Sequence, residues 1–245
     1  MNHQLADRLR SLIAESTDIV VLGGVRMEEE CGINSVRMEN AAYEVEQKYG
    51  YSPEEILTPG FLQNRVEFFY DYFKKYVIQA DKLVPGAAHE AVLRLEKEGR
   101  LRAVITRSPF GLYQMLGCSN VIELRGSIHK YRCMKCGKEY SDAYVMEAPG
   151  VPYCEECKVA LRPDLVLYGE RLNNGITSRA AECVSKADML LVAGSSMKTH
   201  LTNHIIKYYR GKKLILVNNR RCPNDEKADY VIYGRCDEIL PDIIM

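Results

Sequence analysis

Four of the nine cysteines stand in two Cys-x-x-Cys pairs and could bind a metal ion. The first pair is Cys133 and Cys136, the second is Cys154 and Cys157, and the 17 residues 137–153 separate them. This spacing is typical of a zinc ribbon, whereas the alternative is four reduced surface cysteines. Four thiolates leave no position open for water, so we expect one structural Zn²⁺ per chain, which replaces the apolar core that this short polar segment lacks.

A second set of small, polar or basic residues follows short apolar runs, where the ligand-binding residues of a parallel sheet would lie. These residues are Gly23, Gly24 and Arg26, then Arg107 and Ser108, then Arg125, then Gly194, Ser195 and Ser196, and finally Asn218. Glycine at the end of a strand lets a phosphate approach the backbone, and serine or asparagine can bind phosphate or ribose hydroxyls. Each of these segments alone is also an ordinary loop composition, so no single segment decides between a ligand-binding site and a plain loop.

The elements that would position these residues alternate between strands and helices. The apolar runs are 19–22, 103–106, 121–124, 165–167, 189–193, 214–217 and 230–233. Such runs predict strands buried on both faces of a parallel sheet. Between them, residues 6–16 and 87–98 have helical patterns, and Ser52-Pro53-Glu54-Glu55 is typical of a capping box. The alternation predicts an α/β fold with a doubly wound parallel sheet of Rossmann type.

Two segments interrupt this alternation and predict a smaller lobe. Residues from about 33 to 84 are expected to form a mostly helical insertion, and residues 127–161 a compact zinc-ribbon lobe. The large domain would then consist of residues 1–126 and 162–245. The aromatic residues between Phe68 and Tyr76 have the spacing of an amphipathic helix packed on a core, so we assign them no role in a site.

Composition excludes several classes of function. The chain has 33 basic and 33 acidic residues, so it lacks the excess positive charge typical of nucleic-acid-binding proteins. The segment Met1–Arg8 has no apolar core of the signal-peptide type, and no apolar run reaches the roughly 18 residues that span a bilayer. We therefore expect a cytoplasmic protein with reduced thiols that binds neither nucleic acid nor membrane.

An ordered series of motifs resembles the sirtuin family of NAD-dependent protein deacylases and ADP-ribosyltransferases over nearly the whole chain. The matching segments are Gly32-Ile33 with Arg37, Pro85 with Ala88-His89, Glu123 to Ser127, the four cysteines, Arg162 to Glu170, Gly194 to Ser196, and Val217-Asn218. The resemblance implies NAD or ADP-ribose as ligand. It assigns Gly194, Ser195 and Ser196 to the phosphates and Asn218 to the adenosine ribose.

The departures from the family pattern gather where the family carries out its chemistry. The GAGxS loop that cradles NAD is here Gly24-Val25-Arg26-Met27-Glu28, so a glycine has become arginine and a serine has become glutamate. The SGIPxFR segment has Asn34 and Val36 in place of proline and phenylalanine. The TQNID segment reads Thr106 to Phe110, in which Pro109 and Phe110 offer no equivalent side-chain hydrogen bonds.

Arg125 stands where the family has its catalytic histidine. By resemblance, that histidine takes a proton from a ribose hydroxyl, and such a base needs a pKa near the working pH. A guanidinium group stays protonated and has no lone pair to accept a proton, so the family's mechanism is not available through Arg125.

Three functions remain open after this comparison. The first is a catalytically degenerate sirtuin that binds NAD, ADP-ribose or a related anionic nucleotide, with Arg26, Arg107 and Arg125 projecting into the cleft; alternatively, these arginines fill the cleft and pair with residues 28–30. The second is an active NAD-dependent deacylase or ADP-ribosyltransferase that needs no histidine. The third is a structural module that binds a protein or an acyl-lysine peptide between the lobes, by strand pairing along residues 165–170.

Overall fold

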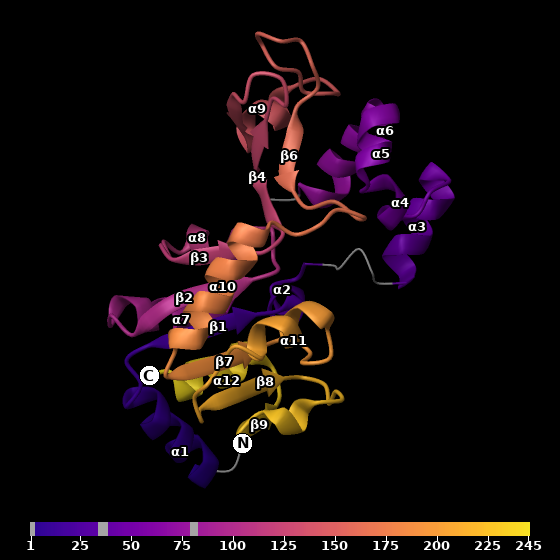
Figure 1. Cartoon of the computed structure of the whole chain (residues 1–245). Helices are drawn as coiled ribbons and strands as arrows, with labels where there is room; N and C mark the ends of the chain where they lie inside the picture. Colours follow the sequence, from indigo (N-terminus) through magenta and orange to yellow (C-terminus); the bar gives the residue numbers. More distant parts are fainter. Residues whose placement is uncertain (1–2, 34–38, 79–82) are drawn as a thin grey trace.

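A six-stranded parallel sheet forms the centre of the large lobe. The structure is a computed structural model that describes residues 3–33, 39–78 and 83–245. The strands are β1 (Ile19–Gly23), β2 (Leu101–Thr106), β3 (Val121–Glu123), β7 (Met189–Ala193), β8 (Leu214–Asn218) and β9 (Tyr230–Tyr233), in the order β3-β2-β1-β7-β8-β9 (Figure 1). The chain winds outward from β1 in one direction and from β7 in the other, which confirms the predicted doubly wound sheet.

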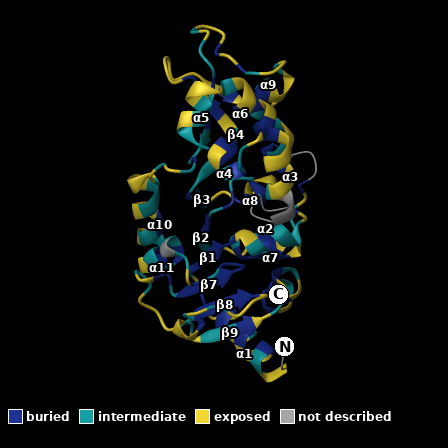
Figure 2. Ribbon diagram, turned by 90° about the vertical axis from the view of Figure 1, so that its right-hand side faces the viewer, coloured by how far each residue is buried: buried dark blue, intermediate teal, exposed yellow. Residues whose placement is uncertain are grey.

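Helices cover both faces of this sheet because its strands are apolar on both sides. The first face packs against α1 (His3–Ala14), α2 (Val25–Glu30), α7 (Ala87–Lys97), α8 (Leu112–Met115) and α12 (Cys236–Ile243), and the second against α10 (Asn174–Lys186) and α11 (His200–Ile206). Figure 2 shows the strands as a buried layer between these helices. Every residue of β1, β7 and β8 is buried.

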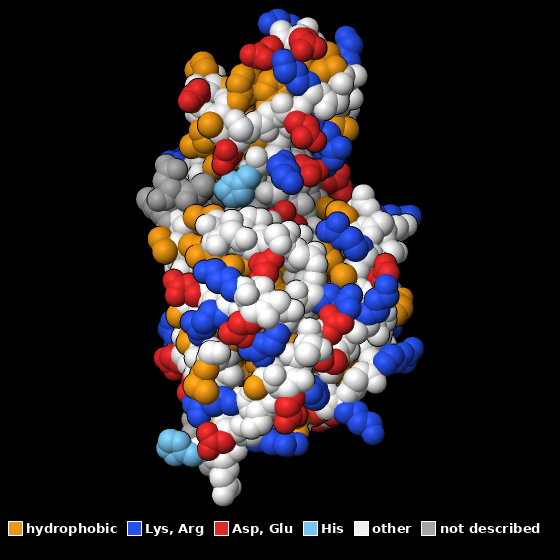
Figure 3. Space-filling model, turned by 90° about the vertical axis from the view of Figure 1, so that its left-hand side faces the viewer, with side chains coloured by type: hydrophobic (Ala, Val, Ile, Leu, Met, Phe, Trp, Pro, Cys, Tyr) orange, Lys and Arg blue, Asp and Glu red, His pale blue; other side chains and the backbone are white. Residues whose placement is uncertain are grey.

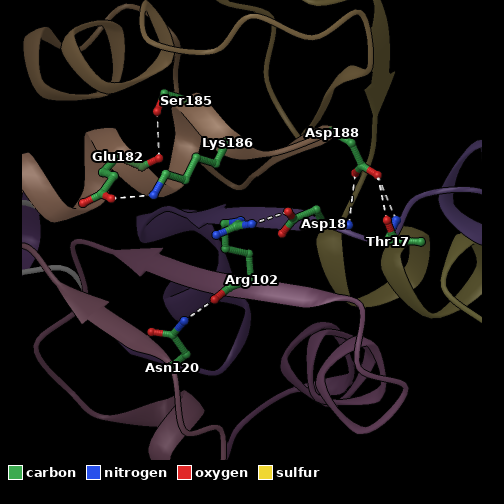
Figure 4. Close-up of polar contacts among 8 residues, drawn as sticks. All are labelled: Thr17, Asp18, Arg102, Asn120, Glu182, Ser185, Lys186 and Asp188. Carbon is green, nitrogen blue, oxygen red and sulfur yellow. Dashed lines mark hydrogen bonds and ion pairs between the residues drawn. The ribbon is translucent and has the colours of Figure 1, made fainter.

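Polar contacts brace the amino edge of the sheet, opposite the edge where the candidate site residues lie. The Asp188 carboxylate, just before β7, accepts hydrogen bonds from the backbone N–H of Thr17 at 2.9 Å and of Asp18 at 3.2 Å (Figure 4). Arg102 in β2 donates to Asp18, and Asn120 donates to the Arg102 carbonyl. The amino ends of β1, β2, β3 and β7 are therefore tied together, which leaves the carboxyl edge available for a ligand.

The small lobe combines a three-stranded antiparallel sheet with the helical insertion. Its elements are β4 (Gly126–Arg132), β5 (Glu139–Ser141), β6 (Arg162–Leu165), α9 (Asp142–Glu147), α3 (Glu39–Tyr49), α4 (Pro53–Ile56), α5 (Pro59–Asn64), α6 (Val66–Tyr72) and a π-helical turn (Phe73–Val77). One apolar cluster joins the two parts, with Phe69 and Phe73 of the insertion packed with Ile128 and Tyr131 of β4. The insertion and the zinc ribbon therefore share one core, and Figure 1 shows the helices of the insertion on the same side of the large lobe as β4 and β6.

The prediction for residues 165–167 was wrong. They were expected to form a strand of the parallel sheet, but the strand in this region is β6, residues 162–165, and it pairs antiparallel with β4 in the small sheet. A short apolar run does not reveal which sheet its strand joins. The strands of the small sheet lie between residues 126 and 165. The capping box is present as predicted, with Ser52 and Glu55 bonded reciprocally.

The surface carries no large area of one charge on the face shown in Figure 3, where basic and acidic side chains are interspersed over both lobes. This agrees with the equal numbers of basic and acidic residues. Among the described residues, no helix is both long enough and apolar enough to cross a bilayer.

Two neighbouring tyrosines in α6 differ in what their buried hydroxyls contact. The Tyr70 hydroxyl donates to the Leu161 carbonyl at 2.6 Å and so ties the insertion to the end of the zinc ribbon. The Tyr72 hydroxyl is also buried, but it has no hydrogen-bond partner in the part of the chain that the structure describes.

We expect Tyr70→Phe to lower the free energy of unfolding by about 1–2 kcal/mol, because the buried Leu161 carbonyl loses its donor. Tyr72→Phe should be neutral or stabilising, because it removes a buried hydroxyl that forms no such bond. Urea unfolding followed by circular dichroism would measure both. Equal losses of stability in the two variants would contradict the assigned role of the Tyr70 hydrogen bond.

Candidate functional site

Two loops meet at the point where the winding of the sheet reverses, between β1 and β7. The N–H of Gly24 donates to the Ala193 carbonyl at 2.8 Å, and the N–H of Arg26 donates to the Gly194 carbonyl at 3.0 Å. A Cβ atom on Gly24 would lie 2.4 Å from the Gly194 carbonyl oxygen, and Gly194 itself has φ +64°. Only glycine allows this approach, so α2 begins directly against the loop that follows β7.

The polar residues predicted to bind a nucleotide lie at this edge. Ser195 is 4% exposed, and its hydroxyl lies 3.2 Å from that of Thr202 in α11. Asn218, at the end of β8, is 2% exposed, and its side-chain oxygen accepts the N–H of Asn219 at 3.0 Å. The Ser196 hydroxyl accepts the N–H of Lys198. The structure thus brings together the ends of β1, β7 and β8, and adds Thr202, which sequence reasoning missed.

Two of the three arginines, Arg26 and Arg125, contact neighbouring groups of the chain. Arg26 forms an ion pair with Glu29 at 2.6 Å, within the same turn of α2. Arg125 donates to the Val166 carbonyl at 3.3 Å, and its guanidinium carbon lies 5.5 Å from the centre of the Tyr168 ring. Arg26 thus pairs with one of residues 28–30, as the alternative expected, whereas Arg125 contacts Val166 and Tyr168 rather than an acid.

Glu28 is a buried acid among these basic groups. It is 7% exposed, and burial raises its pKa to about 7 although three weaker effects act against the shift: the hydrogen bond from the Ser108 side chain and the charges of Arg107 and Arg125. The charge of Glu29 raises the pKa further. The sequence showed only that Glu28 replaces a serine of the loop that cradles NAD in the family, because nothing in a six-residue helix indicates that its acid is buried.

Two other predicted contributors have different outcomes. Arg37 lies outside the described residues. The segment after β6 was expected to pair with an extended peptide, but its N–H groups are already bonded within the chain. Val166 donates to the Arg125 carbonyl, Leu167 to the Glu170 carboxylate and Tyr168 to the Leu57 carbonyl, all at 2.8–2.9 Å. Residues 166–168 therefore offer an added strand no N–H donor.

The four cysteines form a metal-binding cluster at the end of the small lobe. The sulfur atoms of Cys133, Cys136, Cys154 and Cys157 lie within 4.8 Å of one another. Those of Cys136 and Cys154 are 3.7 Å apart, close to the roughly 3.8 Å edge of a tetrahedron with Zn–S bonds of about 2.3 Å. The Tyr140 hydroxyl lies 3.1 Å from the Cys154 sulfur. The cluster fits one structural zinc ion with no open coordination position.

We expect Cys154→Ser to abolish stoichiometric zinc binding and to disorder the small lobe, because Cys133 and Cys154 belong to its apolar core. Zinc content by mass spectrometry should fall from one ion per chain, and the tyrosine near-UV circular dichroism should be largely lost. Cys222→Ser, outside the cluster, is the control and should change neither signal. Normal zinc content in Cys154→Ser would refute this assignment.

We expect Glu28→Gln to stabilise the fold at pH 8 by about 2–3 kcal/mol. Because the folded-state pKa of Glu28 is about 7 and its usual value is 4.5, the folded chain retains a proton that the unfolded chain has released between these pH values. The wild type should therefore lose stability as pH rises through this window, and Glu28→Gln should lose less. Urea unfolding at pH 4.5 and pH 8 would measure the difference, with the exposed Glu90→Gln as control.

Known proteins resemble this chain over nearly its full length. A family model described as the Sir2 family matches residues 24–200. The NAD-dependent protein deacetylase of Clostridium acetobutylicum is 36% identical over 239 residues, which cover 97% of each chain.

Two solved structures extend the comparison to the fold. A structure described as a Sir2 homolog–NAD complex has a TM-score of 0.84 at 29% identity and covers 97% of this chain and 92% of its own. A structure described as Sir2 bound to acetylated peptide has a TM-score of 0.80 at 27% identity, with coverage of 96% and 94%. Because the family model matches most of the chain and a relative is 36% identical over 97% of each chain, this chain belongs to the Sir2 family, the sirtuins.

Proposed function

We propose that this protein binds NAD, ADP-ribose or a related anionic nucleotide at the carboxyl edge of its large sheet and does not carry out histidine-dependent deacetylation. The observation that carries the proposal is Arg125, two residues after β3, at the position of the family's catalytic histidine. A permanently protonated side chain there cannot accept a proton from a ribose hydroxyl.

Residues at the carboxyl edge of the large sheet support the nucleotide-binding half of the proposal. Gly24 and Gly194 bring the loops after β1 and β7 into backbone contact, and Ser195 and Asn218 are buried polar groups at the ends of β7 and β8. Nucleotides bind in doubly wound sheets at such a reversal of strand order. The Sir2 homolog of similar fold was solved with NAD, which supports the same ligand class here.

A second candidate function is an NAD-consuming enzyme that works without a histidine. One observation favours it, namely the buried carboxyl group of Glu28 held by Ser108 beside Arg107 and Arg125. The third candidate, a module that adds a peptide strand along residues 165–170, is weakened because the N–H groups of residues 166–168 in that segment are already bonded.

Calorimetric titration of the zinc-loaded chain with ADP-ribose and with NAD tests the proposal. We expect micromolar binding of ADP-ribose, weakened about tenfold or more in Arg125→Ala, because the variant removes a positive charge from the cleft. Arg132→Ala, which removes an arginine from the small lobe where it pairs with Asp164, is the matched control and should bind as the wild type does.

An assay with an acetyl-lysine peptide tests the second half of the proposal, that the chain does not carry out histidine-dependent deacetylation. The wild type should release no deacetylated peptide in the presence of NAD. Absence of ADP-ribose binding would overturn the nucleotide assignment, and NAD-dependent deacetylation of the peptide would overturn the assignment of Arg125 as a block to that reaction.

A further inference from the structure

The ring of His129 lies where the small lobe meets the large lobe. His129 is in β4, the strand that follows β3 in the chain, and its ring extends to the loop between β2 and α8. Its Nδ1 lies 2.7 Å from the Asp142 carboxylate at the start of α9, and its Nε2 lies 2.9 Å from the Phe110 carbonyl oxygen. A Cβ atom at Gly111 would lie 3.0 Å from Cδ2 of the ring, so the loop packs closely on it. The ring therefore joins two elements of the small lobe to a loop of the large lobe.

The same loop has two other contacts with the small lobe. The N–H of Ile128 in β4 donates to the Pro109 carbonyl at 2.9 Å. The Phe110 side chain packs against the apolar core of the small lobe and also against the cluster that contains Leu112 of α8. Of these three contacts, only the one made by His129 involves a side chain of a type that changes its charge near neutral pH.

Both ring nitrogens of His129 face oxygen atoms that can only accept hydrogen bonds. An ionised carboxylate and a peptide carbonyl have no proton to donate. The two bonds can therefore form together only when both nitrogens carry a proton and the ring is positively charged. The neutral ring has one proton, and the Asp142 carboxylate is a stronger acceptor than a carbonyl. Loss of the Nε2 proton to solvent would leave two lone pairs facing each other at the 2.9 Å contact with Phe110.

We propose that His129 is a pH-sensitive latch between the two lobes, which holds the loop after β2 against β4 when both ring nitrogens are protonated and releases it when Nε2 loses its proton. The inference goes beyond the proposed function, because no ligand takes part. The side chains of His129 and Asp142 are 29% and 37% exposed, so the proton can exchange with solvent. The loop that is held or released carries Ser108, so the latch acts beside the candidate site.

Glu123, at the end of β3, is the other acid that interacts with His129. Burial raises the pKa of Glu123, and the positive charges of Lys130 and His129 act in the opposite direction. In the small sheet, Arg132 of β4 is paired with Asp164 of β6 at 2.6 Å. The remaining charged side chains of the loop after β2 and of the small-lobe elements around β4 are Arg107, Glu139, Glu147 and Arg162. Because the charge of Glu123 can also change with pH, the test needs a variant of Glu123 as its control.

The test is to measure the hydrogen-exchange protection factor of the Ile128 amide by NMR in the zinc-loaded full chain between pH 5 and pH 8. We expect protection to fall by about tenfold or more as pH rises, because the loop loses a hydrogen bond from a charged donor. The amides of β1 and β7 should change by less than about twofold, since they lie in the centre of the large sheet. Nitrogen-15 shifts of the His129 ring should show two N–H groups at pH 5 and the loss of the Nε2 proton over the same pH range.

Three variants assign the effect to this pair. His129→Gln has no ring to titrate, so its Ile128 protection should be the same at pH 5 and pH 8 within about twofold. Asp142→Asn removes the negative charge that favours the protonated ring, so its protection should fall at a lower pH than in the wild type. Glu123→Gln is the control and should retain a fall as large as that of the wild type.

Several results would overturn the inference. One is Ile128 protection that does not depend on pH in the wild type, and another is a fall in His129→Gln as large as in the wild type. Loss of the fall in Glu123→Gln would assign the effect to Glu123 instead. If His129→Gln has lost its near-UV circular dichroism, the nitrogen-15 shifts of the wild type decide: a single ring N–H at pH 5 with Ile128 fully protected would contradict the latch.

Discussion

The backbone contact between the loops after β1 and β7 is the constraint on which the candidate site depends. It requires glycine at 24, because a Cβ there would lie 2.4 Å from the Gly194 carbonyl oxygen, and it requires the positive φ of Gly194. Since α2 begins at this contact, the contact also sets the direction of the helix. Met27 then packs in the core on one face of the sheet, and the next residue, Glu28, is also buried. The carboxyl edge that carries the candidate site and the buried acid therefore both follow from one feature.

The departures from the sirtuin pattern form a coupled set rather than a series of independent losses. A carboxyl group as deeply buried as Glu28 is unfavourable in its ionised form unless positive charge is near. Arg107 and Arg125 supply that charge, and the second acid added to the same helix, Glu29, is paired with Arg26. Removing one of these positive charges alone would leave the buried acid less compensated, whereas neutralising the acid would relieve the cost of burying it. This coupling is easier to reconcile with an altered site than with a cleft that has lost all its constraints.

The small lobe is held together by two interactions that act at opposite ends. At the far end, four cysteines and a shared aromatic core replace the large apolar interior that the segment lacks. At the near end, the His129 ring lies between the Asp142 carboxylate, 2.7 Å from Nδ1, and the Phe110 carbonyl, 2.9 Å from Nε2. Phe110 belongs to the loop that carries Ser108. The small lobe is thus bonded directly to the loop that carries Ser108.

Most of the fold could be predicted from the sequence, because a strand buried on both faces must be apolar throughout, and β1, β7 and β8 are. The cysteine cluster could be predicted from spacing alone. The segment at 165–167 could not be assigned, because local apolar character does not choose between two sheets.

The environment of Glu28 was hidden for a different reason. A helix of six residues has too few turns to show a periodic buried face, and the direction of α2 comes from a contact with a loop about 170 positions later in the chain. The Arg125 side chain, likewise, contacts the Val166 carbonyl and the Tyr168 ring. Both groups belong to a segment that only the tertiary fold brings close to Arg125. The residues at which the sequence alone failed are thus the ones whose chemistry depends on contacts between distant segments, and they are also the ones on which activity would depend.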